Sequence, residues 1–389
     1  MTRDENACGT RFALRARFAH RERCTIRRLV AIAGCVVALH GSIARFDVRP
    51  ARADDAAARI VAGDAELLKY AFQDRLAPGE QVYPPVTSLT ELRQANERML
   101  LPVELYFDAY EHLDLVRAEE MTLHAEKLPV VKLTYELGGR QYETYAYVKK
   151  SPIKTSRAAL VIPGSASNLA TAIYHEIPDG NHTGIMRALG DAFNRYVFIK
   201  PNEDCLAIHN GQGKLHPNFY VNWHIEQGGS YSAHYIVSSL AFSKYLQSNY
   251  AEFIVAGLSQ GGAAALQNAL QSNPDAAIIA SGFSIINRDA QWAGHNQMMI
   301  PGLRKRWDHE AVRKKIAGQA TRYLFNYVEK EVGTYRIEAT AKPSAEFLRT
   351  CQNVEVRTHP GGHEYPADIV ADFLERAFPA AGGAKPSQD

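Results

Sequence analysis

The chain has 389 residues, of which 46% are hydrophobic and 22% charged, and its formal net charge is +2. This balance excludes a disordered tail protein, and five cysteines are too few for a small disulfide-stapled module. No run of 18 apolar residues occurs, so the sequence contains no ordinary membrane span, and its length suffices for one large domain or two average ones.

Residues 1–53 carry most of the positive charge. They contain eleven arginines and four acidic residues, which gives them a net charge of +7 and leaves −5 for the rest of the chain. A weakly acidic body argues against nucleic acid as the main partner, because phosphate binding needs clustered lysine and arginine.

The same region has the layout of an export signal. Arg27 and Arg28 precede the apolar run 29–39, and small residues and an acidic stretch follow it. This order is typical of a secretory signal peptide, so we predict a periplasmic or secreted protein with no stable membrane span after cleavage near Arg45 or Asp54. An uncleaved N-terminal membrane anchor is the alternative.

Export leaves two cysteines, Cys205 and Cys351, and whether they pair stays open. No Cys/His spacing of a metal site occurs, so no metal and no cofactor is expected.

Residues 54–128 carry the pattern of a helical N-terminal extension. Apolar residues recur at three- and four-residue spacing over 57–76 and 88–115, and the turn-rich segment 78–85 separates the two stretches. This is the period of an amphipathic helix, so we predict an accessory helical layer that packs on the main domain.

From residue 129 the pattern changes to that of a sheet. Two alternating stretches flank Gly138 and Gly139, which is the signal of a β-hairpin, and short continuous apolar runs separated by helical segments follow. Runs of this kind suit parallel strands covered on both faces, so we predict an α/β fold with a mostly parallel central sheet and helices on both faces. The predicted strands lie at 130–137, 141–148, 158–162, 196–199, 253–256, 276–280, 323–327 and 354–356, and the main helices at 185–193, 233–246, 260–270 and 367–378.

A G-x-S-x-G motif joins one of these strands to the next helix. Its residues are Gly257-Leu258-Ser259-Gln260-Gly261. Glycines on both sides leave room for a sharp turn that strains the serine and exposes its Oγ at the top of the sheet. The helix N-terminus and the backbone N–H of Gln260 then point toward an oxyanion that forms at Ser259, the candidate nucleophile.

With this motif between a strand and a helix, residues 129–380 resemble the α/β-hydrolase family. The resemblance implies a triad in the chain order nucleophile, acid, histidine. It places the histidine between the strand at 354–356 and the last helix, where His363 is the candidate because flanking glycines let it reach over the serine. His359, which lies nearer the strand, is the competing candidate.

The resemblance also implies an acid in the loop after the strand at 323–327. The family's pattern of an apolar strand followed by Gly-x-x-Asp puts Glu331 at the acid and Val328 where glycine is usual. Glutamate is an accepted replacement for aspartate in this role. Glu329 and Asp289 are the alternatives, so three carboxylates remain open.

The second oxyanion donor is expected from the loop after the strand at 158–162. That loop begins Pro163-Gly164-Ser165, where relatives commonly carry His-Gly. By position the backbone N–H of Ser165 is the donor, and the proline removes only a side chain that would form hydrogen bonds.

Two long connections, 201–232 and 282–320, are predicted to be lid-like insertions, because functional loops of α/β sheets gather at the carboxyl ends of the strands. Their histidines fit no metal spacing, and their Trp and Met residues either fill the core or line a pocket for an apolar or ring-shaped group. These residues are His209, His216, His224, Trp292, His295, Met298, Met299 and Trp307. The tail 381–389 is expected to be flexible.

Together these features predict an exported serine hydrolase, and more specifically a carboxylic-ester hydrolase that works through an acyl-enzyme on Ser259. The expected substrate is a small-molecule or carbohydrate-linked ester. Two alternatives stay open: an acyltransferase that uses the same triad, and a binding scaffold that keeps the fold without the activity.

Overall fold

The computed structural model describes residues 97–123, 128–165, 169–177, 184–201, 217–282, 298–328 and 348–379, together with residues 90, 94 and 182. The chain divides into two compact units, Met1–Ala62 and Gly63–Asp389, and every described residue belongs to the second. The predicted signal region 1–53 and the predicted flexible tail therefore lie outside the described residues.

Residues 97–99 are helical, as predicted, and two short helices and a strand follow them. The 3-10 helix η2 (Val103–Leu105) and helix α4 (Ala109–His112) precede strand β1 (Asp114–Leu123). The prediction of a helical extension up to residue 128 is therefore wrong over its last part. The Glu, Arg, Met and Ala residues of β1 favour a helix in isolation, but antiparallel pairing with β2 (Leu128–Leu137) overrides that preference. Its charged side chains suit its position at the edge of the sheet.

Strands β2 and β3 (Arg140–Lys149) form the predicted hairpin. Leu137 pairs with Arg140, so Gly138 and Gly139 alone make the turn. Their φ values are +61° and +74°, and a two-residue turn of type I′ needs a positive φ at both positions.

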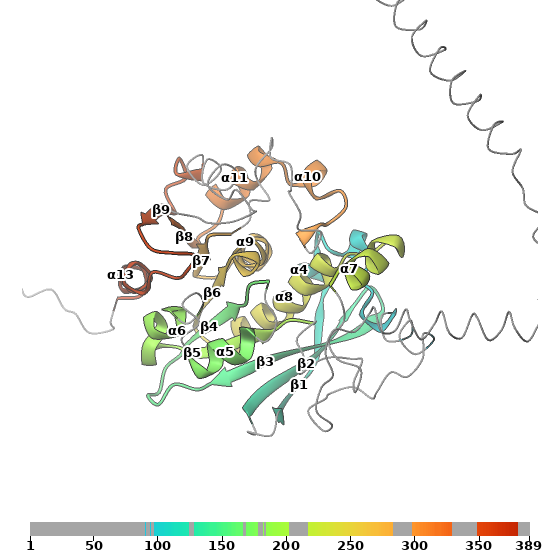
Figure 1. The fold of residues 1–389 in the computed structure, drawn as a ribbon, viewed down its shortest axis with the longest axis horizontal. Helices are drawn as coiled ribbons and strands as arrows, with labels where there is room; N and C mark the ends of the chain where they lie inside the picture. Colours follow the sequence, from blue (N-terminus) through green and yellow to red (C-terminus); the bar gives the residue numbers. More distant parts are fainter. Residues whose placement is uncertain are drawn as a thin grey trace, which may run out of the picture. The chain divides into compact units, whose positions relative to one another are not determined.

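Six further strands complete a sheet of nine described strands (Figure 1). They are β4 (Arg157–Ile162), β5 (Asn194–Ile199), β6 (Glu252–Leu258), β7 (Ala276–Ala280), β8 (Arg322–Val328) and β9 (Val354–His359). The strand order is β1-β2-β3-β5-β4-β6-β7-β8-β9. β3 pairs antiparallel with β5, and the pairs from β5 to β9 are all parallel, as predicted.

Helices cover both faces of this sheet, and each face has its own buried apolar cluster. Helices α8 (Tyr231–Asn249) and α9 (Gln260–Ser272) pack on one face, and α5 (Leu169–His175), α6 (Gly184–Leu189) and α13 (Ala367–Ala377) on the other (Figure 1). The remaining helices are η3 (Gly190–Ala192), α7 (Pro217–Glu226), α10 (Leu303–Arg306) and α11 (His309–Ala317). This arrangement confirms the predicted α/β architecture.

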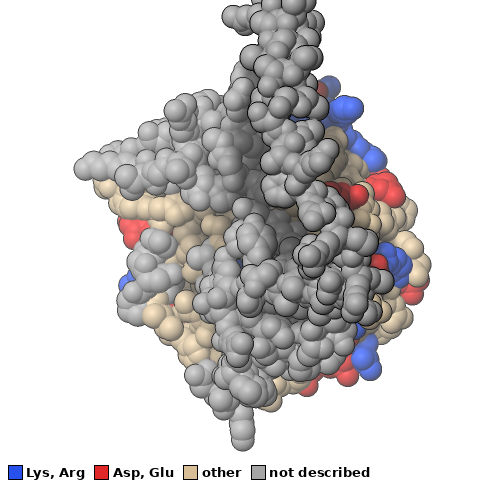
Figure 2. Space-filling view, turned by 45° about the vertical axis from the view of Figure 1, so that its right-hand side comes forward, with Lys and Arg blue, Asp and Glu red and all other residues tan. Residues whose placement is uncertain are grey.

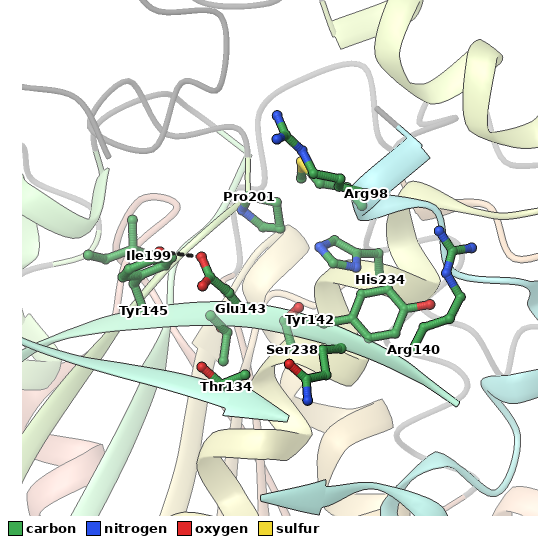
Figure 3. A pocket seen from close by; sticks show the side chains of 13 residues that line it. Arg98, Thr134, Arg140, Tyr142, Glu143, Tyr145, Ile199, Pro201, His234 and Ser238 are labelled. Atoms are coloured by element: carbon green, nitrogen blue, oxygen red, sulfur yellow. Dashed lines mark hydrogen bonds between the residues drawn. The ribbon is translucent and has the colours of Figure 1, made fainter. Parts of the chain in front are cut away.

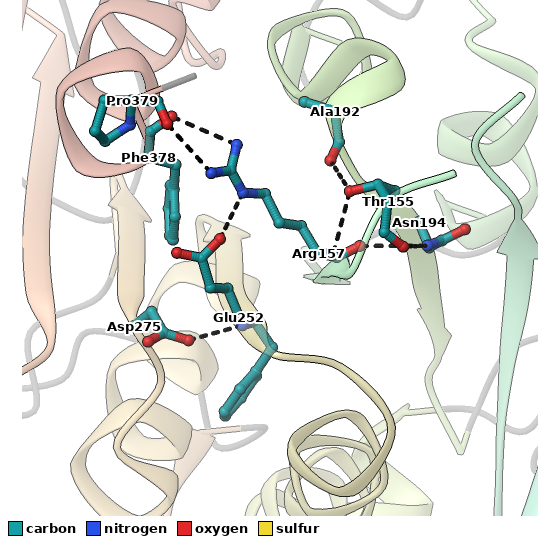
Figure 4. Close-up of polar contacts among 9 residues, drawn as sticks. Thr155, Arg157, Ala192, Asn194, Glu252, Asp275, Phe378 and Pro379 are labelled. Atoms are coloured by element: carbon teal, nitrogen blue, oxygen red, sulfur yellow. Dashed lines mark hydrogen bonds and ion pairs between the residues drawn. The ribbon is translucent and has the colours of Figure 1, made fainter. Parts of the chain in front are cut away.

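A polar network closes the edge at which the parallel strands begin (Figure 4). The guanidinium of Arg157, on β4, donates to Oε2 of Glu252, on β6, at 2.5 Å and to the carbonyl oxygens of Phe378 and Pro379 at 3.4 Å. It also lies over the Phe378 ring, 5.4 Å from the centroid. The end of α13 is thereby tied to β4 and β6 at the edge opposite the G-x-S-x-G motif.

No helix in the described part of the chain is both long and apolar enough to cross a membrane. On the face drawn in Figure 2, Lys and Arg side chains are interspersed with Asp and Glu over the described surface.

Candidate active site

Ser259 lies in a strained turn between the end of β6 and the start of α9. Its φ of +62° and ψ of −122° fall outside the regions that residues with side chains normally occupy. Its backbone N–H donates to the carbonyl oxygen of Ala280 at 2.9 Å, and its own carbonyl accepts from the N–H of Ala263 at 3.1 Å. The side chain is 5% exposed and does not cap the helix that follows it, so the hydroxyl has no structural duty at the helix end.

Close backbone contacts explain the glycines of the motif. A Cβ on Gly257 would lie 1.9 Å from the carbonyl oxygen of Gly261, and a Cβ on Gly261 would lie 2.1 Å from that of Ile162. A Cβ on Gly262 would come within 2.8 Å of the carbonyl oxygen of Ala280. Atoms so close overlap, and only glycine fits at these positions.

The loop after β4 lies directly against this turn. A Cβ on Gly261 would also lie 2.7 Å from the carbonyl oxygen of Pro163, and a Cβ on Gly164 would lie 3.2 Å from that of Leu258. The structure thus brings the start of this loop beside the residues that flank Ser259.

The two predicted oxyanion donors lie on these adjoining segments. Gln260 is buried as the first residue of α9, where backbone N–H groups have no partner within the helix. Ser165 is half-buried, and no described residue accepts a hydrogen bond from its backbone N–H. A site that can hold a negatively charged oxygen needs such donors on two sides.

Two buried side chains hold the loop by its carbonyl oxygens. Nζ of Lys200 donates to the carbonyl oxygen of Gly164 at 2.6 Å, and the Tyr235 hydroxyl donates to that of Pro163 at 2.8 Å. Lys200 directly follows β5 and is 1% exposed, whereas Tyr235 belongs to α8 and is fully buried. Neither residue was predicted from the sequence, although a lysine directly after an apolar strand places a charge at the carboxyl edge of the sheet.

The two candidate histidines differ in their surroundings. His363 is half-buried in the loop between β9 and α13. His359 is the last residue of β9, pairs with Val328 and is 7% exposed. Its Nδ1 accepts a hydrogen bond from the N–H of Gly361 at 3.1 Å, so its imidazole shapes the turn into the loop. This structural duty favours His363 as the base.

Two members of the predicted triad, Ser259 and His363, belong to the described residues. Glu331, Glu329 and Asp289 lie outside the described residues. The last residue of β8 pairs with the last residue of β9. The chain therefore leaves β8 toward Glu329 and Glu331 beside the strand that leads to His363.

A polar cavity of about 580 Å³ lies at the end of β5 (Figure 3). Neither Ser259 nor His363 is among its described lining residues. Lys200 and Tyr235 hold the loop after β4, and residues next to them in the chain belong to the wall of this cavity. The wall is formed by Arg98, Met99, Thr134, Arg140, Gln141, Tyr142, Glu143, Thr144, Tyr145, Ile199, Pro201, His234 and Ser238.

Polar atoms without a partner lie in this wall. Nδ1 of His234 and Oγ1 of Thr134 and Thr144 are buried and have no hydrogen-bond partner among the described residues. Burial, and to a smaller extent the nearby His224, lowers the pKa of His234 to about 3. The imidazole is therefore neutral at pH 7, and the three unpartnered atoms are closed off from solvent.

The predicted lid residues that the structure describes belong mostly to the interior. Met298 and Trp307 are 3% and 8% exposed, and the Trp307 ring packs on Tyr106 and Phe107 with centroids 5.9 and 6.3 Å apart. Met298 and Trp307 thus fill the core rather than line an apolar pocket. His224 is fully buried and Met299 is exposed. His209, His216, Trp292, His295 and Cys205 lie outside the described residues, and Cys351 is a buried free thiol.

The solved structures that resemble this chain are distant from it in sequence. Est1E from Butyrivibrio proteoclasticus is 13% identical, with a TM-score of 0.39 over 67% of this chain and 98% of that one. The esterase Pf2001 from Pyrococcus furiosus is 12% identical, with a TM-score of 0.38 over 69% of this chain and 94% of that one. A carbohydrate esterase family 15 glucuronoyl esterase from Caldicellulosiruptor kristjansonii is 13% identical, with a TM-score of 0.43 over 80% of this chain and 89% of that one. No protein-family model and no curated protein matches the sequence.

The fold is therefore assigned from the chain's own features. A mostly parallel sheet covered by helices on both faces carries a strained serine in a glycine-flanked turn from a strand into a helix. The loop of another strand lies against that turn. These features identify the chain as a protein of the α/β-hydrolase fold.

Proposed function

We propose that the chain is a serine hydrolase that cleaves carboxylic esters. The observation that carries this proposal is the strained backbone of Ser259 at the N-terminus of α9, beside the Pro163-Gly164 loop. Strain at a single residue persists only where the surrounding structure enforces it, and here three glycines allow the close backbone contacts that hold the turn around Ser259. A strained serine in such a turn is explained by the role of a nucleophile.

In the proposed reaction, His363 takes the proton of Ser259 Oγ as that oxygen attacks the carbonyl carbon of the ester. The backbone N–H groups of Gln260 and Ser165 hold the oxyanion. Collapse of the tetrahedral intermediate breaks the bond to the leaving alcohol, which takes the proton from the imidazole, and leaves an acyl-enzyme on Ser259. Water then attacks the acyl carbon while the imidazole takes its proton. Collapse of this second intermediate breaks the bond to Ser259 Oγ, which takes the proton back from the imidazole as the carboxylic acid leaves.

The proposed acid is Glu331. Its carboxylate would accept a hydrogen bond from the imidazole of His363, fix the orientation of the ring and stabilise its charged form. Glu329 and Asp289 remain the alternatives for this role.

We propose that the non-reacting part of the substrate binds in the polar cavity. Its wall carries the exposed or half-buried polar side chains of Arg98, Arg140, Gln141 and Glu143, which suit a part that forms hydrogen bonds rather than a long hydrocarbon chain. A small-molecule or carbohydrate-linked ester meets this condition.

We also propose that the chain is exported, on the basis of the arginine-flanked apolar run at 29–39. Mature protein from an exporting host should begin near Arg45 or Asp54, which its intact mass shows. Full-length protein in the soluble outer fraction would contradict cleavage of the signal, and full-length protein in the membrane fraction would point to the N-terminal anchor.

Hydrolysis of p-nitrophenyl acetate tests the proposed activity. Ser259→Ala should lower the rate at least about a thousandfold, because the acyl-enzyme can no longer form. Ser239→Ala is a matched control, since Ser239 is a buried serine of α8 whose Oγ donates to the carbonyl oxygen of Ile236 at 2.7 Å. A folded wild-type protein that hydrolyses neither this ester nor hydroxylated esters would favour the binding scaffold.

A further inference from the structure

The hydrogen bonds from Lys200 and Tyr235 end on two consecutive peptide groups of the loop after β4. Their acceptors are the carbonyl oxygens of Gly164 and Pro163, at 2.6 and 2.8 Å. In a trans peptide the C=O and the N–H of the next residue point in opposite directions. With the Gly164 carbonyl fixed toward Lys200, the N–H of Ser165 is therefore aimed away from the lysine.

We infer that Lys200 and Tyr235 are positioning residues that orient the Ser165 N–H for the oxyanion. The inference rests on the proposed function, because it gives both side chains a role in the same reaction. Lys200 acts on the peptide group that contains this N–H, and Tyr235 acts on the peptide group before it. Both act through the loop, and neither is assigned a contact with the substrate.

The hydrogen bond from Lys200 also makes the Ser165 N–H a stronger donor. A carbonyl that accepts a hydrogen bond draws electron density toward its oxygen, which leaves the N–H of the same peptide more positive. Such cooperative strengthening amounts to about 10–30% per bond and is larger where the dielectric is low. Lys200 is 1% exposed, so its bond to Gly164 lies away from bulk water.

Rigid elements bring the two side chains to the loop. Val161 of β4 pairs with Val197 of β5 in parallel register, and Gly164 and Lys200 each follow three residues later, just beyond the ends of the two strands. Tyr235 lies in the second turn of α8, a helix that packs on one face of the sheet, and its side chain reaches the loop from there. A donor held from a strand end and from a helix is positioned more precisely than one held by its loop alone.

The competing interpretation is that the two bonds only stabilise the fold. A fully buried lysine is rare, because taking its ammonium group out of water is costly, so its presence demands a reason. A stabilising role and a positioning role differ in what a folded variant does. Loss of positioning weakens the binding of the transition state and leaves the binding of the substrate unchanged.

The test uses the full chain, p-nitrophenyl acetate as substrate and phenylboronic acid as a tetrahedral inhibitor that bonds to the serine. Removal of one oxyanion donor costs about 10²–10³ in kcat, so Lys200→Met, which misaligns but keeps the donor, should lower kcat about tenfold to a hundredfold. KM should stay within about twofold, and boronate inhibition should weaken by the same factor as kcat. Tyr235→Phe should show the same pattern with a loss of about threefold to tenfold.

Tyr135→Phe is the matched control, because it also removes a buried hydroxyl, one that lies 3.2 Å from Ser238 Oγ. It should leave kcat and boronate inhibition unchanged. Folded Lys200→Met and Tyr235→Phe variants with wild-type kcat would overturn the inference, and so would variants in which KM rises while kcat holds. Loss of folding in both, with a folded Tyr135→Phe, would also overturn it, because the two bonds would then belong to stability.

Ser259→Ala separates this inference from the proposed function. An inactive Ser259→Ala beside a fully active Lys200→Met overturns the inference alone. A fully active Ser259→Ala overturns the proposed function and the inference with it.

Discussion

Two histidines, His359 and His363, lie four residues apart at the end of β9 and in the loop that follows it, and the proposed chemistry needs only one of them. His359 ends a strand and accepts the Gly361 N–H, whereas His363 lies in the loop itself. His363→Ala should lower kcat on an activated ester at least about a thousandfold, because the serine loses its base. His359→Ala should lower the melting temperature and reduce kcat about tenfold or less. The reverse order of the two losses, in variants with wild-type circular dichroism, would move the base to His359.

The acid can be assigned by removing one charge at a time. Glu331→Gln should lower kcat far more than Glu329→Gln, since only the true partner stabilises the charged imidazole. The equivalent change in a serine protease costs about 10⁴-fold. Small and equal losses in both variants, together with a large loss in Asp289→Asn, would assign the role to Asp289.

For single residues, the sequence predicts the side chains that belong to a motif. It does not predict side chains whose role depends on the three-dimensional arrangement of separate elements. Ser259 and Gln260 stand in the strained turn that G-x-S-x-G predicts. Lys200 and Tyr235 belong to no motif, and their approach to Gly164 and Pro163 depends on how β4, β5 and α8 are placed together. A distance between residues far apart in the chain cannot be read from their spacing in it.

At the scale of elements, the turn between β6 and α9 depends on close contacts that the sequence shows only as glycines. Gly261→Ala should destabilise the protein by about 2–3 kcal/mol, because the added Cβ would lie 2.1 Å from the carbonyl oxygen of Ile162. Gly318→Ala is the matched control, since its Cβ would meet its nearest neighbour, the carbonyl oxygen of Lys314, at 3.4 Å. Denaturant unfolding measures both. Equal stabilities would contradict the packing described for the turn.

The buried strands were predictable and the edge strand β1 was not. β4 to β8 are short and largely apolar because helices cover both faces of the sheet, and such runs stand out in a sequence. β1 is an edge strand whose charged residues give the composition of a helix. It is a strand because β2 pairs with it, and this long-range pairing leaves no local signal.

For the whole molecule, the buried His234 predicts how stability depends on pH. Its pKa is about 3 in the folded protein and about 6.5 in an unfolded chain, so the unfolded state binds a proton that the folded state excludes. The stability that this group contributes is present above about pH 6.5 and is lost as the pH falls toward 3. In wild type this group should lower the free energy of unfolding by up to about 1.4 kcal/mol per pH unit in that range.

His234→Gln removes this titration and should make the decline shallower. Urea unfolding at pH 7, 6, 5 and 4 measures the free energy of unfolding of both proteins. In the difference between the two values, the titration of the other histidines cancels. Identical slopes in both proteins would contradict a neutral, buried His234.

The central claim is that Ser259 is the nucleophile, and covalent labelling tests it most directly. Wild-type protein is treated with a fluorophosphonate, and peptide mass spectrometry locates the adduct. We predict one adduct per chain, on Ser259, with no labelling of Ser259→Ala and greatly slowed labelling of folded His363→Ala. An adduct on another serine, or no adduct on folded wild-type protein, would contradict the claim.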